Sequence, residues 1–113
     1  MRGVKPIMAI KFAMATSLIL IIVNLMKQLK LRAILAQMDA FEKQHGYDDR
    51  GFCGMLEGGE CYLFLRLNKK GNIRGSAPTA CCIIRKGHIT FYEGDEARQL
   101  LQKYRIGFNS ILF

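Results

Sequence analysis

The chain has 113 residues, a net charge of +8 and 50 % hydrophobic residues. This length is that of one ordinary domain, and a charged fraction of 23 % is too high for a chain that lies mostly within a membrane. Residues 1–46 carry seven Lys or Arg against two acids, whereas residues 47–113 carry ten against seven. The C-terminal part therefore lacks the basic field typical of nucleic-acid binding, and no nucleic-acid partner is predicted.

An apolar segment lies near the N-terminus. Residues 12–26 carry no charge, and eight of the fifteen are Leu, Ile, Val or Phe. Lys11 can extend its side chain toward the headgroups, which lets the apolar stretch begin at Ile7. As a helix, residues 7–26 would be roughly 30 Å long, which is enough to cross a bilayer. The sequence therefore predicts a single-pass transmembrane helix within an N-terminal membrane anchor, residues 1–26, with the lipid bilayer as a partner.

Basic residues flank this segment on both sides, where anionic headgroups attract them. They are Arg2 and Lys5 before it and Lys27, Lys30, Arg32 and Lys43 after it, while Lys11 lies within it. A cleaved signal peptide would need small residues just after the apolar core, and Lys27 and Gln28 stand there instead. A buried helix of a water-soluble protein stays an alternative, because the apolar run is short. The flanking charges are nearly balanced, with a slight excess that favours the domain on the cytoplasmic or matrix side.

Helix-forming residues continue beyond the anchor to His45 without Gly or Pro. Apolar residues recur in this stretch at steps of three and four, and they are Leu31, Ile34, Leu35, Met38 and Phe41. Gly46 is well placed to end the helix as a left-handed cap. We therefore predict that residues 27–46 form an amphipathic helix that continues the anchor and lays this apolar stripe on a small domain.

Residues 47–113 are predicted to form a small α+β domain outside the membrane. The Gly- and acid-rich stretch 47–60 has little apolar periodicity and is expected to be a loop. Strands are expected where β-branched, aromatic and alternating apolar residues gather, at 61–67, 80–85 and 88–93. Turn residues at 68–72 and the pair Lys86-Gly87 separate these strands, which predicts an antiparallel meander.

A short C-terminal helix is predicted to begin near Asp95, whose side chain can cap it, and to end at Gly107. One face of this helix would carry Ala97, Leu100, Leu101 and Tyr104. The closing apolar residues 108–113 are either a last strand or a patch that docks on a partner. The predicted class is therefore α+β, with one long N-terminal helix, a small antiparallel β-meander and a short C-terminal helix.

The residues that could bind a metal or act as nucleophile and base are Cys53, Cys61, Cys81, Cys82, His45 and His88. Zinc sites usually present pairs of ligands two to four residues apart, whereas successive cysteines here are separated by eight and twenty positions or are adjacent. No recognised motif surrounds any of the cysteines. The sequence therefore predicts no metal site and no catalytic residue.

The carboxylates that occur in pairs lie in predicted loops or at a helix start, where they are expected to be solvated or to cap. They are Asp48 with Asp49, Glu57 with Glu60, and Asp95 with Glu96. The glycine-rich stretches match neither a phosphate-binding loop nor a dinucleotide-binding fingerprint. No cofactor and no small-molecule substrate are therefore predicted, and the sequence favours a protein without enzymatic activity.

The state of the cysteines depends on their positions in the predicted strands. Cys81 and Cys82 are adjacent, so on a strand they project to opposite faces, and at most one is expected in the core while the other is turned outward. Free thiols are the preferred prediction. In an oxidising compartment, a disulfide to Cys53 or Cys61 is the alternative.

The order of elements, a long helix with its first half in lipid and then an antiparallel meander, resembles the general build of type IV pilin-like subunits. Those families carry a leader ending in Gly, then Phe and a Glu four residues further on, whereas here Lys11 and Phe12 are followed by Thr16 and Ser17. The leading functional hypothesis is a single-pass membrane-anchored accessory or structural subunit of a larger membrane complex, which contacts other protein subunits. The alternatives are a pilin-like filament subunit and a membrane-tethered thiol or metal protein.

Overall fold

The computed structural model describes the backbone of residues 4–112 and the side chains of residues 17–112. Its elements are α1 (Val4–His45), β1 (Asp49–Leu56), β2 (Gly59–Leu65), β3 (Ala80–Arg85), β4 (His88–Glu93), α2 (Gly94–Lys103) and the 3-10 helix η1 (Phe108–Ser110). The chain divides into two compact units, Met1–Ala33 and Ile34–Phe113. The predicted α+β class is confirmed, with its long N-terminal helix, antiparallel sheet and short C-terminal helix.

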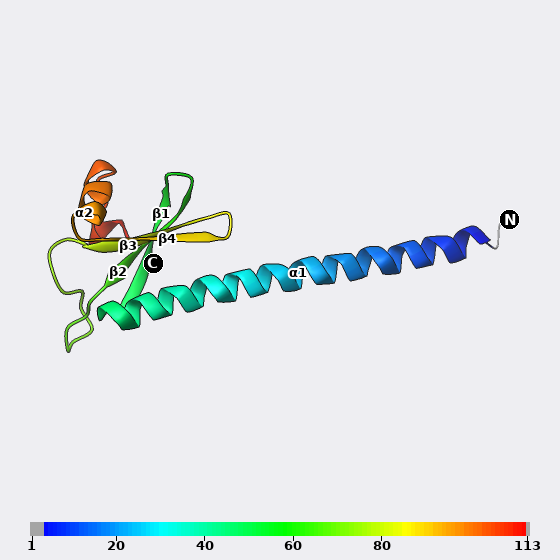
Figure 1. The fold of residues 1–113 in the computed structure, drawn as a ribbon, viewed down its shortest axis with the longest axis horizontal. Helices are drawn as coiled ribbons and strands as arrows, with labels where there is room; N and C mark the ends of the chain where they lie inside the picture. The colour runs from blue at the N-terminus through cyan, green and yellow to red at the C-terminus, as the bar shows by residue number, and fades with distance from the viewer. Residues whose placement is uncertain (1–3, 113) are drawn as a thin grey trace. The chain divides into compact units, whose positions relative to one another are not determined.

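The four strands form one antiparallel sheet in which each strand pairs with its neighbour in the chain (Figure 1). Two-residue turns join β1 to β2 and β3 to β4. In the second turn, Lys86 and Gly87 have φ angles of 47° and 79°. A type I′ hairpin turn requires positive φ at both central residues. The predicted turn at this pair and the strands on either side of it are therefore confirmed.

Strand β1 corrects the expectation that residues 47–60 form a loop. The strand pairs with β2 along its whole length, but the register shifts between Phe52 and Gly54. This bulge inserts Cys53 as an extra residue and breaks the period-two pattern that predicts a strand. Gly51 weakens the signal further, because glycine is depleted in strands. The meander consequently has four strands instead of the three that were expected.

Helices cover both faces of the sheet in the Ile34–Phe113 unit, which makes three layers. The core between the sheet and α2, the α2-side core, contains Leu56, Cys61, Leu63, Leu65, Cys81, Ile83, Ala97, Leu101 and Ile111. The core between the sheet and the C-terminal part of α1, the α1-side core, contains Ile34, Met38, Phe41, Phe64, Ala80 and Cys82. The predicted alternation of side chains along β2 is confirmed, and both of its faces are buried because each has a helix on it.

Three buried apolar residues of α1 pack on the sheet. Ile34, Met38 and Phe41 are 7 %, 1 % and 8 % exposed, and their spacing places them in one row along the helix. The ring of Phe41 lies between two aromatic residues of the sheet, with centroid distances of 4.7 Å to Phe64 and 4.5 Å to Phe91. This row of side chains attaches the end of α1 to the sheet, mainly through apolar and aromatic contacts.

The predicted apolar stripe on α1 is wider than the part that is buried. Leu31 and Leu35 were expected to lie on the stripe, yet they are 57 % and 40 % exposed. They are one helical turn apart, in the row adjacent to the buried one. The small sheet contacts a single row of the helix, so the neighbouring leucines remain outside the core.

The end of α1 is closed by Gly46, as the sequence predicts. Its φ angle of 73° is in the left-handed region, and the backbone N–H of Tyr47 donates to the carbonyl oxygen of Glu42 at 2.9 Å. This is the long-range bond of a Schellman motif. The guanidinium of Arg66 also donates to the carbonyl oxygen of His45 at 3.0 Å. Carbonyl groups at the end of the helix therefore accept hydrogen bonds both from the backbone of the cap and from the side chain of Arg66.

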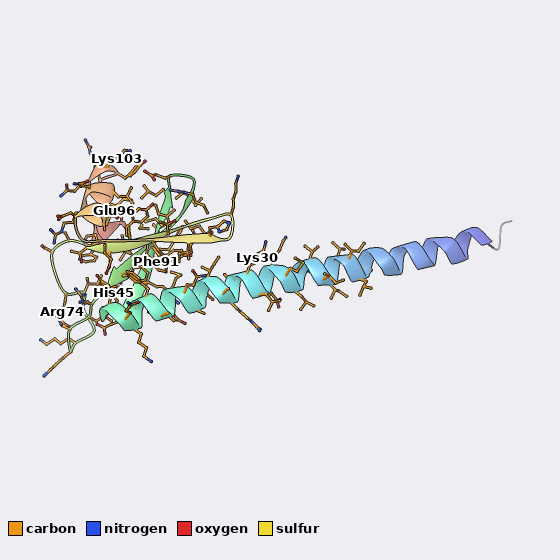
Figure 2. All side chains as sticks on the ribbon, in the orientation of Figure 1. Lys30, His45, Arg74, Phe91, Glu96 and Lys103 are labelled. Carbon is orange, nitrogen blue, oxygen red and sulfur yellow. The ribbon has the colours of Figure 1, made fainter. Side chains whose placement is uncertain are left out.

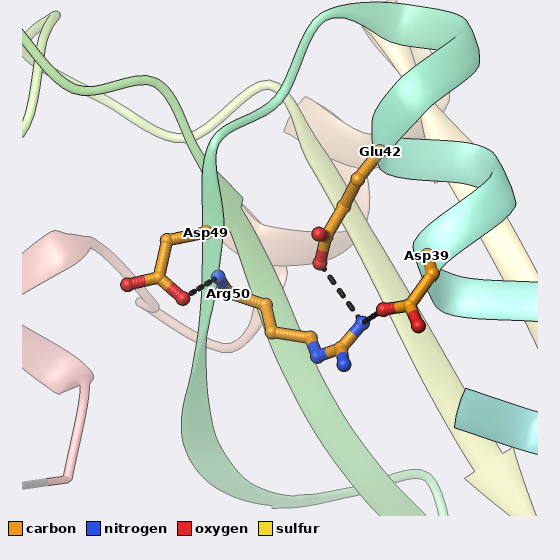
Figure 3. Close-up of polar contacts among 4 residues, drawn as sticks. All are labelled: Asp39, Glu42, Asp49 and Arg50. Carbon is orange, nitrogen blue, oxygen red and sulfur yellow. Dashed lines mark hydrogen bonds and ion pairs between the residues drawn. The ribbon is translucent and has the colours of Figure 1, made fainter. Parts of the chain in front are cut away.

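A polar contact ties the same end of α1 to β1 (Figure 3). Nη1 of Arg50 donates to Oδ1 of Asp39 and to Oε1 of Glu42, at 3.0 Å in both cases. The backbone N–H of Arg50 also donates to Oδ1 of Asp49 at 2.8 Å. The side chain of Glu42 is only 16 % exposed, so this ion pair is more protected from water than a surface pair.

The second helix begins at Gly94, one residue before Asp95, and it ends earlier than predicted. Its N-cap is Glu93, because β4 leads directly into α2, and Asp95 lies in the first turn instead of capping. A carboxylate in the first turn still favours the positive end of the helix. The helix ends at Lys103, before Arg105 adopts a left-handed φ of 56°, and not at Gly107.

The chain's last described residues pack on the sheet of the same unit. Ile111 is 7 % exposed in the α2-side core, and its side chain fills the space beside Gly51 on β1. The backbone N–H of Leu112 donates to the carbonyl oxygen of Phe52 at 2.8 Å. The segment 108–112 is thus neither a strand nor a free docking patch, although both were offered as alternatives, and Leu112 is its one exposed large apolar residue.

Glu42 is expected to make the stability of the fold depend on pH. Burial raises the pKa of its carboxyl above the usual 4.5, and the charge of Arg50 offsets this only in part. A carboxyl whose pKa rises on folding stabilises the fold fully below its unfolded pKa, and this contribution is lost as the pH rises through the folded pKa. We therefore expect Glu42→Gln to remove one component of the loss of stability that occurs as the pH rises above the usual carboxyl pKa of 4.5.

Urea unfolding of the full chain at a series of pH values, followed by tyrosine fluorescence, measures this effect. The control is Glu96→Gln, which removes the same charge from an exposed position of α2 and should leave the wild-type profile unchanged. Identical pH profiles for the wild type and Glu42→Gln would contradict the expectation.

Candidate functional site

Exposed apolar side chains follow one another along α1 from Leu18 to Met26. Every residue in this stretch except Asn24 is Leu, Ile, Val or Met, and these are between 41 % and 61 % exposed. Successive positions on an α-helix are about 100° apart, so the six consecutive residues 18–23 face every direction around the axis. A helix that is apolar on all sides is typical of the interior of a large protein or of a membrane span.

The predicted transmembrane helix at 7–26 is only partly within the described side chains. Across the part of the chain that the structure describes, no helix is both long enough and apolar enough to cross a membrane. Residues 7–16, the first half of the predicted span, have side chains that lie outside this part. The apolar segment that can be described is therefore Leu18 to Met26.

The character of the helix changes after Met26. Lys27, Lys30 and Arg32 are exposed, and Figure 2 labels Lys30 among them. Leu29 and Leu31 stand between these cations and are 63 % and 57 % exposed. Cations alternating with leucines suit a boundary between apolar and aqueous surroundings, because the long basic side chains can reach water while their stems cover apolar surface.

The four cysteines are distributed over both cores of the sheet, and all are free thiols. Cys61 and Cys81 belong to the α2-side core, and Cys53 packs against it from the bulge of β1. Cys82 lies in the α1-side core. The prediction that the adjacent cysteines project to opposite faces is confirmed. The expectation that one of them is turned outward is wrong, because a helix covers each face and both are fully buried.

Contacts between thiols and burial raise the pKa values of Cys53, Cys61 and Cys82. The thiol of Cys53 donates to the carbonyl oxygen of Cys61 at 3.3 Å. Its hydrogen bond with the Cys61 thiol, and then burial, raise the pKa of Cys53 well above its usual value. The Cys53 bond lowers the pKa of Cys61, but a bond with Cys81 and burial outweigh it and raise that pKa to about 12. Burial, followed by the nearby Cys61, raises the pKa of Cys82 to about 12.

These thiols are poorly suited to nucleophilic chemistry, because the reactive form is the thiolate and a raised pKa makes it rare at neutral pH. The two histidines that were considered with them lie elsewhere. His45 ends α1, where its Nδ1 is 2.9 Å from Oε1 of Glu93, and His88 is exposed at the start of β4. Among the described residues, no group of three or more His, Cys, Asp or Glu is arranged to hold a metal ion.

The paired carboxylates have mainly structural partners. The side chain of Asp48 accepts a hydrogen bond from the backbone N–H of Leu67 at 2.8 Å. Glu57 accepts hydrogen bonds from Arg85 and from the hydroxyl of Tyr104, both at 3.1 Å. The remaining contacts, all with groups close in the sequence, are those of Asp49 with the Arg50 N–H, Glu60 with Tyr62, and Asp95 with Arg98. These contacts fix turns and element ends, and they do not form an acid–base pair.

Sequence reasoning missed one polar feature of this unit. Arg66 and Arg74 both line a cavity beside the end of α1. They are eight positions apart, on either side of the turn at 68–72, and the backbone N–H of Arg74 donates to the carbonyl oxygen of Arg66 at 2.7 Å. The signal that could have found them is the predicted turn itself, because residues that flank a hairpin-like turn are brought side by side.

Comparison with known proteins yields no relative for this chain. No protein-family model matches it. No curated protein matches it. No solved structure matches it. Its function must therefore be argued from the physical properties of its surfaces.

The burial of the thiols predicts how the cysteines react with an alkylating reagent. Iodoacetamide added to the folded chain should label only Cys53, which is partly exposed, and slowly because its raised pKa keeps the thiolate scarce. After denaturation without reductant, mass spectrometry should count four labels. Cys53→Ser should abolish the native label and leave three after denaturation. Rapid labelling of two or more sites in the folded protein, or fewer than four labels after denaturation, would contradict this arrangement.

Proposed function

We propose that the protein is a single-pass, membrane-anchored accessory or structural subunit of a larger membrane complex. In this proposal residues 7–26 anchor the chain in the bilayer, and the Ile34–Phe113 unit contacts other protein subunits. The observation that carries the proposal is the exposed stretch Leu18–Met26, which is apolar on every side of its helix.

The distribution of exposure favours lipid as the surroundings of this stretch. A helix that docks on one protein surface needs a single apolar row, like the row Ile34, Met38 and Phe41 on the sheet. Residues 18–23 instead present apolar side chains to all directions, and water around them would be unfavourable by about 25 cal/mol for each Å² of apolar surface. Lipid removes this penalty on all sides at once.

The charges on either side of the stretch also support lipid as its surroundings. Lys27, Lys30 and Arg32 follow it directly and are exposed. Each cation near an anionic membrane surface contributes about 1 kcal/mol of attraction. Arg2, Lys5 and Lys11 precede it in the sequence, so both ends of the proposed span carry positive charge.

A protein partner is proposed for the exposed leucines that follow the anchor. Leu31 and Leu35 are one turn apart, are not used by the sheet of this chain, and lie next to the buried row of α1. An i, i+4 pair of leucines is the kind of contact that a second helix can use. These residues support the part of the proposal that assigns the protein to a complex.

A pilin-like filament subunit is the second candidate, and one observation favours it. The C-terminal part of α1 packs on an antiparallel sheet through the row of Ile34, Met38 and Phe41, which is the build to which the sequence was likened. The third hypothesis, a tethered thiol or metal protein, gains no support from the raised thiol pKa values.

Extraction with alkaline carbonate tests the anchor. We expect the wild-type chain to stay in the membrane pellet. Leu18→Lys places a charge near the middle of the proposed span, which costs about 2.5 to 3.5 kcal/mol, and should increase the fraction that is released. The control is Leu112→Lys, at an exposed position of the other unit, which should behave as the wild type. Release of the wild type into the supernatant would reject the span.

Purification in mild detergent tests the partner. We expect the chain to co-migrate with other proteins, which mass spectrometry can identify, and the double variant Leu31→Ser, Leu35→Ser to reduce this co-migration. Leu112→Ser is the control for loss of an exposed leucine. Filaments in electron micrographs would select the pilin-like alternative, whereas a monomer free of other chains would contradict both.

A further inference from the structure

A cavity of about 170 Å³ lies in the Ile34–Phe113 unit, where the chain leaves α1 and where the segment between β2 and β3 passes. Its lining includes two arginines, Arg66 and Arg74, together with the aromatic rings of Tyr47, Phe64 and Phe108. Figure 2 labels Arg74 on the segment that joins β2 to β3. The volume is below the roughly 300 to 1,000 Å³ of sites for drug-sized ligands, so any occupant must be small.

Arg66 is held in place before any ligand arrives. The centre of its guanidinium lies 4.4 Å above the ring of Tyr47. Its Nη2 donates to the carbonyl oxygen of His45 at 3.0 Å, and its Nε is 3.4 Å from the carbonyl oxygen of Gly46. Stacking and these bonds fix the plane of the guanidinium, while Nη1 keeps its donors for another group. A pre-ordered arginine loses little conformational entropy on binding an anion.

Arg74 supplies a second cation without a counter-charge. Its guanidinium forms no hydrogen bond or ion pair with any residue that the structure describes, and no acidic residue lines the cavity. Two guanidinium groups therefore bring a charge of +2 to one small space. A phosphate monoester carries about −1.5 to −2 charges at pH 7 and accepts several hydrogen bonds, which matches two arginines better than a carboxylate with a single charge.

The aromatic rings of the lining indicate that the anion carries an organic group. Phe64 is almost fully buried at 1 % exposure and closes the inner side of the cavity, while Tyr47 and Phe108 are partly exposed on its walls. An inorganic ion would leave this apolar surface unused. We propose that the cavity binds a small phosphate monoester, with the phosphate between Arg66 and Arg74 and the organic group against the aromatic walls. The proposal is independent of the membrane anchor.

Isothermal titration calorimetry on the full chain in a non-ionic detergent tests this site. Phenyl phosphate is the probe, and inorganic phosphate and benzoate are the comparison titrants. We expect phenyl phosphate to bind more tightly than inorganic phosphate, which lacks the aromatic group, and than benzoate, which has one charge. Arg74→Gln should weaken the binding of phenyl phosphate by about tenfold to a hundredfold, as loss of a charge-assisted hydrogen bond does.

The matched control is Arg98→Gln, which removes the same charge from the exposed face of α2 and should leave the affinity unchanged. Arg66→Gln should also weaken binding, but Arg66 holds the end of α1, so the exposed Arg74 carries the test. The proposal is overturned if the wild type binds none of the three titrants, or if Arg98→Gln weakens binding as much as Arg74→Gln. Tighter binding of inorganic phosphate than of phenyl phosphate would overturn the assignment to an ester.

Discussion

The contact of one row of α1 with the sheet is the interaction on which the Ile34–Phe113 unit depends. The central strands carry apolar side chains on both faces, so a sheet covered only by α2 would leave Phe64 and Cys82 in water. Met38 and Phe41 cover them from the other side, and both are at most 8 % exposed. The end of the long helix is therefore part of the domain's core. Because the sheet buries this row, the large apolar residues of α1 that stay exposed beside it are Leu31 and Leu35.

This arrangement also explains why Cys61, Cys81 and Cys82 are buried. A helix on each face turns what would be an exposed position of a two-layer fold into a buried one, and Cys82 loses its access to solvent in this way. On the opposite face, contacts with neighbouring thiols and burial raise the pKa values of Cys53 and Cys61. Buried free cysteines of this kind pack as small apolar residues.

The functional proposals rest on two surfaces that differ in their physical character. The stretch Leu18–Met26 exposes apolar side chains on all sides of its helix, and the proposed membrane anchor is based on this observation. The cavity at Arg66 and Arg74 is lined by two guanidinium groups and three aromatic rings, a combination that suits a small organic anion. Anchoring and ligand binding are therefore proposed for different residues and can be tested separately.

The sequence by itself determined the features that depend on local periodicity and turn chemistry. These include the long helix closed by Gly46, the strands on either side of Lys86 and Gly87, and the alternation along β2. It did not reveal β1, because the bulge at Cys53 interrupts the period of two on which strand prediction depends.

Only the tertiary structure decided which apolar residues are buried and which charges meet. Leu35 and Met38 belong to the same predicted stripe, yet the sheet covers Met38 and leaves Leu35 exposed. Arg50 reaches Glu42, and Arg66 and Arg74 share a cavity, through the placement of strands and turns. The physical reason is that burial and electrostatic pairing depend on distances between segments, and a sequence pattern specifies only the period within each segment.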